Sequence, residues 1–134
     1  MTELNFFTDR SLGDVIVPTA LREAGWNVVS MVERYGQLTA EALADIHWIP
    51  EATERGEILL TGDKMIARRP LEAAAVARAG ARVFALSNGQ IRGADKAARY
   101  LRWQKAIFRR ALSETAPYVV GVTGHGLERL TLHD

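Results

Sequence analysis

The sequence predicts an α/β protein with a mainly parallel sheet of about five strands flanked by helices. Short apolar segments alternate along the chain with longer segments of helical periodicity. Strands that alternate with helices form parallel sheets covered on both faces, because each right-handed crossover lays its helix against the sheet. The 134 residues, 48% hydrophobic and 25% charged, leave room for one folded domain over residues 1–134.

The first part of the chain contains the opening strand, helix, strand pattern. Leu4–Phe7 is a short apolar run that predicts the first strand. Because Pro18 is tolerated only near a first turn, the helix that follows is expected to begin close to it and to end before Gly25. Trp26–Val32, which is apolar and partly β-branched, predicts the second strand.

The rest of the chain continues this alternation. Apolar residues recur at three- and four-residue steps over about residues 39–55, which predicts a helix. Pro50 lies inside it and cannot donate a helical hydrogen bond, so we expect a kink or a split there. The remaining expected elements are a strand over 57–61, a helix over 70–79, a strand over 82–86, a helix over about 94–113, a strand over 118–123 and a tail over 127–132 that can pair with the sheet.

Two aspartates closely follow predicted strands. Asp9 comes two residues after the first strand, and Asp63 comes two residues after the third. In open α/β sheets the functional crevice lies beyond the carboxyl ends of the strands, so both should project from the same edge. Asp45 lies on the apolar stripe of its helix, three residues before Trp48, and a buried carboxylate needs a partner or a cation. The three acids together predict a site at this edge.

Carboxylate oxygens are preferred ligands of hard divalent cations, so Asp9, Asp45 and Asp63 are candidate ligands of Mg2+ or Mn2+. Such a site leaves room for a phosphate oxygen and activates water. Each acid also has a structural interpretation. An aspartate after a strand often closes a turn or caps a helix, and Asp45 could bond to backbone at a helix break near Pro50. The metal site is supported by the set rather than by any one residue.

Three segments carry a resemblance to a known family. They are Leu-Asn-Phe-Phe-Thr-Asp-Arg around Asp9, Asp-Ile-His-Trp-Ile from Asp45, and Glu-Ile-Leu-Leu-Thr-Gly-Asp-Lys around Asp63. Their order and spacing, over residues 4 to about 88, resemble the PIN-like domains, and in particular the VapC-type toxin ribonucleases. The resemblance implies a PIN-like three-layer sandwich and a Mg2+- or Mn2+-dependent endoribonuclease whose catalytic metal ligands are Asp9, Asp45 and Asp63. It also implies an RNA substrate, a partner antitoxin of a type II toxin–antitoxin pair, and a homodimer.

Other charged residues extend the resemblance or depart from it. Many PIN domains have a further helix acid between the first and third positions, for which Glu33 is the candidate here. A second aspartate often follows the Thr-x-Asp motif, where this chain has Lys64-Met65-Ile66, so a weakened or one-metal site is an alternative. Arg10 and Lys64 adjoin proposed ligands and are candidate contacts to a substrate phosphate, with ion pairs to the same aspartates as the alternative.

Charge is distributed unevenly along the chain. Residues 1–60 carry a net charge of −6 and residues 61–134 a net charge of +7, although the total is only +1. This asymmetry fits an acidic, cation-holding centre beside a surface that meets a polyanion. The chain has no cysteine, which excludes disulfide frameworks and thiolate metal sites. Without an apolar run of membrane-span length or a signal-like start, we expect a cytoplasmic protein with no membrane association.

Two other classes of protein fit part of the pattern. A receiver-like phosphoacceptor domain also has acids after its first and third strands, but such domains have paired acids after the first strand and a lysine after the fifth, which this chain lacks. A non-catalytic binding or assembly module would keep the fold without a complete site, in line with the missing fourth acid. Labelling by a small phosphodonor would favour the first alternative, whereas tight metal binding would count against the second.

Overall fold

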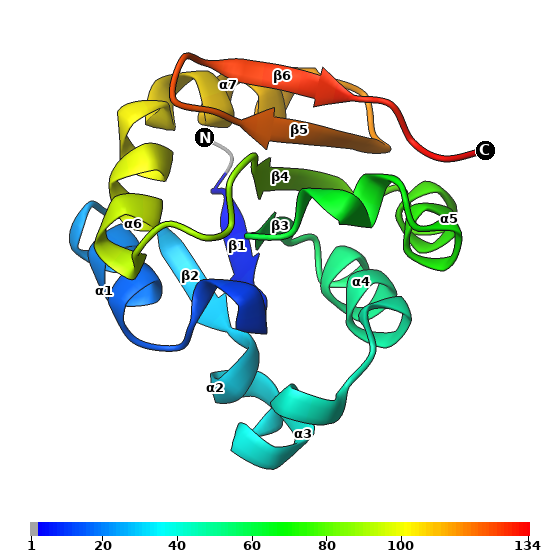
Figure 1. The fold of residues 1–134 in the computed structure, drawn as a ribbon, viewed down its shortest axis with the longest axis horizontal. Helices are drawn as coiled ribbons and strands as arrows, with labels where there is room; N and C mark the ends of the chain where they lie inside the picture. Colours follow the sequence, from blue (N-terminus) through cyan, green and yellow to red (C-terminus); the bar gives the residue numbers. More distant parts are fainter. Residues whose placement is uncertain (1–2) are drawn as a thin grey trace.

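The computed structural model describes residues 3–134, which contain a six-stranded sheet between two layers of helices (Figure 1). The strand order is β2-β1-β3-β4-β5-β6, in which the first five strands are parallel and β6 is antiparallel to β5. The strands are β1 (Asn5–Thr8), β2 (Asn27–Ser30), β3 (Ile58–Thr61), β4 (Arg82–Leu86), β5 (Tyr118–Val122) and β6 (Leu127–Leu130). The mainly parallel α/β sandwich is therefore confirmed, and the predicted tail segment supplies the sixth strand.

Helices cover both faces of this sheet. They are α1 (Ile16–Glu23), α2 (Met31–Tyr35), α3 (Gln37–Ala42), α4 (Asp45–Glu54), α5 (Pro70–Ala79), α6 (Gly93–Arg102) and α7 (Gln104–Ser113), with 3-10 turns η1 (Arg10–Leu12) and η2 (Lys64–Ala67). Buried residues of α1, α6 and α7 belong to one core, and those of α2 to α5 to the other. Within residues 3–134, none of the helices combines the length and apolar character that a bilayer span needs.

The strand sequences explain why there are two cores. Successive side chains of a strand point to opposite faces, so adjacent apolar residues supply different layers. Phe6 packs with the α1, α6 and α7 layer, whereas Phe7 packs with the α2 to α5 layer. In β3 all four residues are buried, and Leu59 and Leu60 likewise divide between the two cores. Strands that are apolar throughout are therefore required at the centre of this sheet.

The second strand is shorter than predicted, because its last apolar residues form a helix instead. The prediction covered Trp26–Val32, but β2 ends at Ser30 and Met31 begins α2. Ser30 accepts a hydrogen bond from the backbone of Glu33, and the Glu33 side chain accepts one from the backbone of Ser30. This reciprocal capping box satisfies otherwise unpaired amide groups at the start of the helix. Local capping thus outweighs the β-branched composition.

The long helix predicted over residues 39–55 is divided, but not at Pro50. The break lies at Leu43 and Ala44, between α3 and α4, and Pro50 is accommodated inside α4. Pro50 is exposed, whereas Trp48 and Ile49 beside it are fully buried. Burying two large apolar side chains stabilises the helix by about as much as the roughly 3 kcal/mol that an interior proline costs. The predicted split at Pro50 was therefore wrong, because the helix continues through this residue.

The helix predicted over residues 94–113 is also divided, at Trp103 between α6 and α7. The Trp103 backbone amide donates to the Tyr100 carbonyl at 3.2 Å, which tightens the last turn of α6. Its indole nitrogen donates to the Thr123 carbonyl at 2.9 Å, beyond the end of β5. The turn is therefore tied to the sheet by a contact between residues 20 positions apart, which helical periodicity does not reveal.

Candidate active site

Asp9 directly follows β1 and is buried, with 5% of its surface exposed. One carboxylate oxygen accepts hydrogen bonds from the backbone amide of Ser11 at 3.1 Å and its hydroxyl at 2.5 Å, and the other accepts one from the Thr61 hydroxyl at 2.6 Å. Burial raises the pKa of Asp9 to about 6, an effect that these hydrogen bonds oppose and the charge of Asp45 increases. The hydrogen bonds thus hold the Asp9 carboxylate in place, but burial still makes its ionised form less favourable than it would be in water.

Ser11 and Thr61 join Asp9 to the end of β3. The Ser11 hydroxyl accepts a hydrogen bond from the Gly62 amide at 2.7 Å, and the Thr61 hydroxyl accepts one from the Asp63 amide at 3.1 Å. Because β1 and β3 are adjacent and parallel, their carboxyl ends lie at the same sheet edge, as the sequence predicted. The backbone leading to Asp63 is therefore positioned by the same two hydroxyl groups that hold Asp9.

Asp45 is the first residue of α4, and 17% of its side chain is exposed. Its carboxylate accepts a hydrogen bond from the indole nitrogen of Trp48 at 2.9 Å and lies 3.8 Å from the Arg10 guanidinium. Burial raises the pKa of Asp45, the Trp48 hydrogen bond and the Arg10 charge lower it, and the nearby charges of Glu72 and Asp63 raise it further. Asp45 is thus electrostatically linked to both of the other predicted acids.

Asp63 lies just beyond β3 and is partly exposed. One of its carboxylate oxygens accepts a hydrogen bond from the Met65 amide at 3.0 Å, so it caps η2 just as Asp9 caps η1. Arg69 donates to the other oxygen at 2.6 Å. Asp9 and Asp63 therefore both have the capping role that the sequence left open, and both lie at the carboxyl edge of the sheet.

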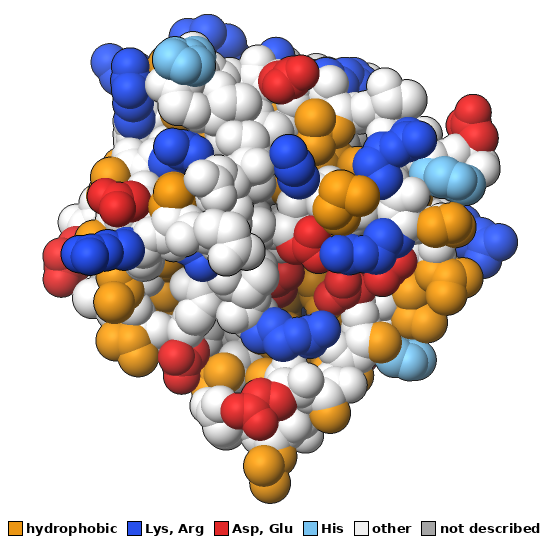
Figure 2. Space-filling model, in the orientation of Figure 1, with side chains coloured by type: hydrophobic (Ala, Val, Ile, Leu, Met, Phe, Trp, Pro, Cys, Tyr) orange, Lys and Arg blue, Asp and Glu red, His pale blue; other side chains and the backbone are white. Residues whose placement is uncertain are grey.

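In Figure 2, acidic side chains gather near the middle of the visible face with Lys and Arg side chains among them.

The two predicted phosphate contacts have different surroundings. Arg10 donates hydrogen bonds to the carbonyls of Ala40 at 3.3 Å and Leu43 at 2.7 Å, which ties η1 to the connection between α3 and α4. Its ion pair is with Asp45 rather than with the adjacent Asp9. Lys64 is exposed, and within residues 3–134 it forms no salt bridge. Arg10 thus has a structural role, whereas Lys64 remains free to meet a ligand.

Glu33, the predicted candidate for a further acid, has a structural role in α2. Its carboxylate caps the helix through Ser30 and pairs with Arg22, and these contacts lower its pKa, the backbone hydrogen bond from Ser30 most of all. Glu41 of α3 lines a hollow of about 280 Å³ together with Asp9, and its carboxylate accepts a hydrogen bond from Gln37. Glu41 lies in the same sequence interval as Glu33, so only the fold distinguishes them.

The donor atoms of these side chains suit a divalent cation, although the side chains are not arranged as a complete set of ligands. Asp9, Asp45 and Asp63 offer only oxygen donors, and Asp9 is a desolvated carboxylate whose raised pKa a cation would offset. As placed, however, no three Asp, Glu or His side chains within residues 3–134 stand together as ligands of one ion. Two of the three acids instead contact an arginine, Asp63 with Arg69 and Asp45 with Arg10. The donors are of the right type, but the set is not closed.

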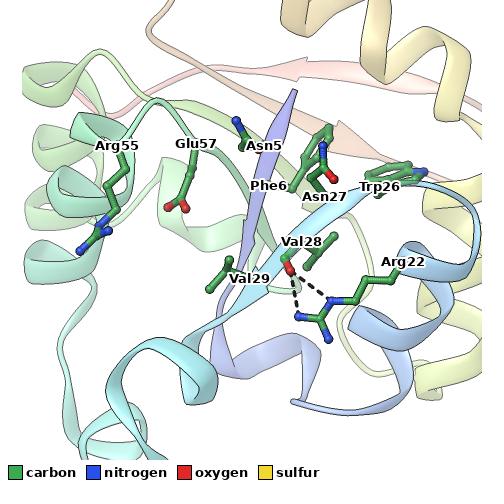
Figure 3. Close-up of a pocket in the computed structure, with 9 residues that line it drawn as sticks. All are labelled: Asn5, Phe6, Arg22, Trp26, Asn27, Val28, Val29, Arg55 and Glu57. Carbon is green, nitrogen blue, oxygen red and sulfur yellow. Dashed lines mark hydrogen bonds between the residues drawn. The ribbon is translucent and has the colours of Figure 1, made fainter. Parts of the chain in front are cut away.

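A separate hollow of about 340 Å³ lies at the opposite edge of the sheet, where the strands begin (Figure 3). Asn5 and Asn27 from the starts of β1 and β2 line it, and Arg22 at its rim donates to the Val28 carbonyl. Glu57, the acid of this hollow, is paired with Arg34. The aspartates at the carboxyl edge therefore have no counterpart here.

Comparisons with known proteins show the family to which the chain belongs. The family model described as "PIN like domain" matches residues 4–88, which include Asp9, Asp45 and Asp63. A curated relative from Mycobacterium tuberculosis, named "Putative ribonuclease VapC45", is 39% identical over 107 residues, covering 80% of this chain and 78% of that protein. No solved structure matches. The resemblance predicted from the sequence is confirmed, and the chain belongs to the PIN-like domain family.

Proposed function

We propose that this protein is a metal-dependent endoribonuclease whose active site is formed by Asp9, Asp45 and Asp63. The observation that carries the proposal is the position of Asp9, a buried carboxylate at the carboxyl edge of the sheet whose pKa is raised mainly by burial and further by the charge of Asp45. Burial is also the main cause that raises the pKa of Asp45, to which the charge of Asp63 adds. Membership of the PIN-like family and the ribonuclease name of the relative support RNA as the substrate.

The three acids have distinct roles in this proposal. Asp9 is the innermost ligand, Asp45 is oriented by Trp48, and Asp63 completes the set from the end of β3. A bound Mg2+ or Mn2+ ion would supply Lewis-acid activation for phosphodiester hydrolysis. The hydroxyl groups of Ser11 and Thr61 donate hydrogen bonds to the Asp9 oxygens and fix their orientation. The carboxylate therefore needs little rearrangement to bind a metal ion. Lys64, exposed beside Asp63, is the proposed contact to a substrate phosphate, with Arg10 contributing positive charge.

We further propose that the protein is the toxin of a type II toxin–antitoxin pair, with a small antitoxin partner, a homodimeric state and a cytoplasmic location, and that residues 1–134 act as one domain. The support is the VapC name of the relative and the resemblance to VapC-type toxins. Expression of the protein alone and together with a candidate small antitoxin would test the partner. Growth arrest by the protein alone, rescue of growth by the antitoxin and a co-purifying complex are the expected results.

The nuclease is tested with purified protein and a mixed RNA pool in Mg2+, in Mn2+ and in chelator. Asp63→Ala and Asp9→Asn variants, purified in parallel, separate the activity of this site from a contaminating ribonuclease. We expect cutting that requires the metal and is lost in both variants, while their circular dichroism matches that of the parent. Cutting that persists in either variant would exclude this site.

The alternative is a non-catalytic binding or assembly module, and one observation favours it. No three acidic or His side chains within residues 3–134 are placed as ligands of one ion. Calorimetric titration with Mn2+ distinguishes the two proposals without relying on activity. Binding to the parent but not to Asp63→Ala supports the nuclease site, whereas no binding and no cutting support the module.

A further inference from the structure

Arg69 covers the carboxylate of Asp63. Its two terminal nitrogens lie 2.6 Å and 3.5 Å from the two Asp63 oxygens, and one of these oxygens also accepts the Met65 amide at 3.0 Å. Both Asp63 oxygens therefore have a donor, although each keeps a further lone pair for a cation. A divalent ion bound there would lie close to the Arg69 guanidinium, whose positive charge opposes its binding.

The Arg69 guanidinium lies among the negative charges of the site. The hydrogen bond to Asp63 raises the pKa of Arg69, and the charges of Asp63, Glu72 and Asp45 raise it further against the opposing effect of burial. Two of these three acids are proposed metal ligands. The guanidinium therefore lies where negative charge converges, which is the position that an added cation would favour.

The other arginine of the site differs in how it is held. Arg10 donates to two backbone carbonyls, those of Ala40 and Leu43, so its position does not depend on Asp45. Within residues 3–134, the Arg69 side chain donates hydrogen bonds to Asp63 alone, and 45% of it is exposed. Exposed ion pairs of this kind are weak. Arg69 can therefore leave at small cost, whereas Arg10 stays.

We propose that Arg69 is a built-in competitor of the metal: its guanidinium occupies the cation position at Asp63 in the metal-free protein and swings away when a divalent ion binds. The inference rests on the proposed function, because it assumes that Asp63 is a metal ligand. It makes Arg69 a residue that sets metal affinity without being a ligand.

The test is calorimetric titration with Mn2+ of the parent and the Arg69→Ala variant. Removing a positive charge from beside Asp63 is expected to strengthen Mn2+ binding about threefold to tenfold, the range that a partly screened contact supports. The variant should fold, because the Arg69 side chain does not cap α5, and its backbone amide still donates to Met65. The melting temperature in chelator checks this.

Arg68→Ala is the matched control. It removes the same charge one residue earlier, where the guanidinium donates to the Thr131 carbonyl at 3.2 Å rather than to an acid of the site. Tighter Mn2+ binding by Arg69→Ala but not by Arg68→Ala supports the proposal. If Mn2+ binding were strengthened equally in both variants, the effect would come from net charge alone, and the proposal would be overturned. Unchanged or weaker binding by Arg69→Ala would also overturn it.

The failure of this inference is distinguishable from failure of the nuclease. If the parent binds Mn2+ and cuts RNA but Arg69→Ala binds no tighter, only the competitor is wrong. If neither protein binds Mn2+, both proposals fail. A direct readout is the Arg69 Nε–H signal in an NMR titration with Mg2+, with Arg34, paired to Glu57, as internal reference. We expect the Arg69 signal to move while that of Arg34 stays, and a stationary Arg69 signal at saturation would overturn the proposal.

Discussion

The indole nitrogen of Trp48 donates a hydrogen bond to the carboxylate of Asp45 at 2.9 Å, and this links the core to the candidate active site. Trp48 is fully buried, and its ring lies 5.4 Å from that of Phe7 in the central strand β1. A side chain anchored on both sides has little rotational freedom. Asp45 is therefore oriented by a rigid neighbour, although it is itself at the rim of the site.

Replacing Trp48 with phenylalanine should weaken metal binding while the protein remains folded. The change retains an aromatic ring against Phe7 but removes the donor to Asp45. Because partners that orient a ligand typically contribute 10- to 100-fold to metal affinity, we expect Mn2+ binding to weaken about tenfold. Trp103→Phe is the matched control, since its indole donates to the Thr123 carbonyl instead. Equal Mn2+ affinities in the two variants would show that the Asp45 contact is dispensable.

The buried carboxylate of Asp9 predicts a pH-dependent stability in chelator. Its pKa is raised from 3.8 to about 6, so the proton binds the folded state more tightly than the unfolded state. This contribution to stability is fully present below about pH 4 and is lost as the pH rises through about 6. A shift of this size corresponds to roughly 3 kcal/mol at neutral pH.

Asp9→Asn removes this titration and isolates its effect. In urea unfolding with chelator, the variant should be more stable than the parent at pH 7 by up to about 3 kcal/mol, and the difference should shrink toward pH 4. Saturating Mn2+ should reverse the order at pH 7, because only the parent gains from binding. A stability difference that does not change between pH 4 and pH 7 would contradict the assignment of the raised pKa to Asp9.

The ion pair between Arg34 and Glu57 predicts a strong effect on stability far from the acids. Both side chains are about nine-tenths buried, and two hydrogen bonds of 2.6 Å and 2.5 Å join them. Breaking a buried pair leaves an uncompensated charge, so Arg34→Ala should lower the free energy of unfolding by about 3 to 5 kcal/mol. Arg129→Ala, which breaks an exposed pair with Glu114, should cost less than about 1 kcal/mol. Similar losses in the two variants would refute this distinction.

Some features of the site were predictable because they depend on residues near one another in the sequence. Asp9 and Asp63 follow apolar strands, and a parallel sheet brings the ends of such strands to one edge. Asp45 precedes Trp48 by one helical turn, so its inward direction was also expected. The continuation of α4 through Pro50 was not predictable in the same way, because it depends on the burial of Trp48 and Ile49 in the core.

The sequence by itself determined the alternation of strands and helices, the parallel sheet and the candidate acids, because periodicity and strand ends are local properties. Only the tertiary structure decided which charges meet. It gave Glu33 to a helix cap and placed Arg69 rather than Lys64 on Asp63. It also placed Arg10 beside Asp45, 35 residues away, rather than beside its neighbour Asp9. Such pairs depend on how separate elements pack together, and packing is set by the whole core rather than by any one segment.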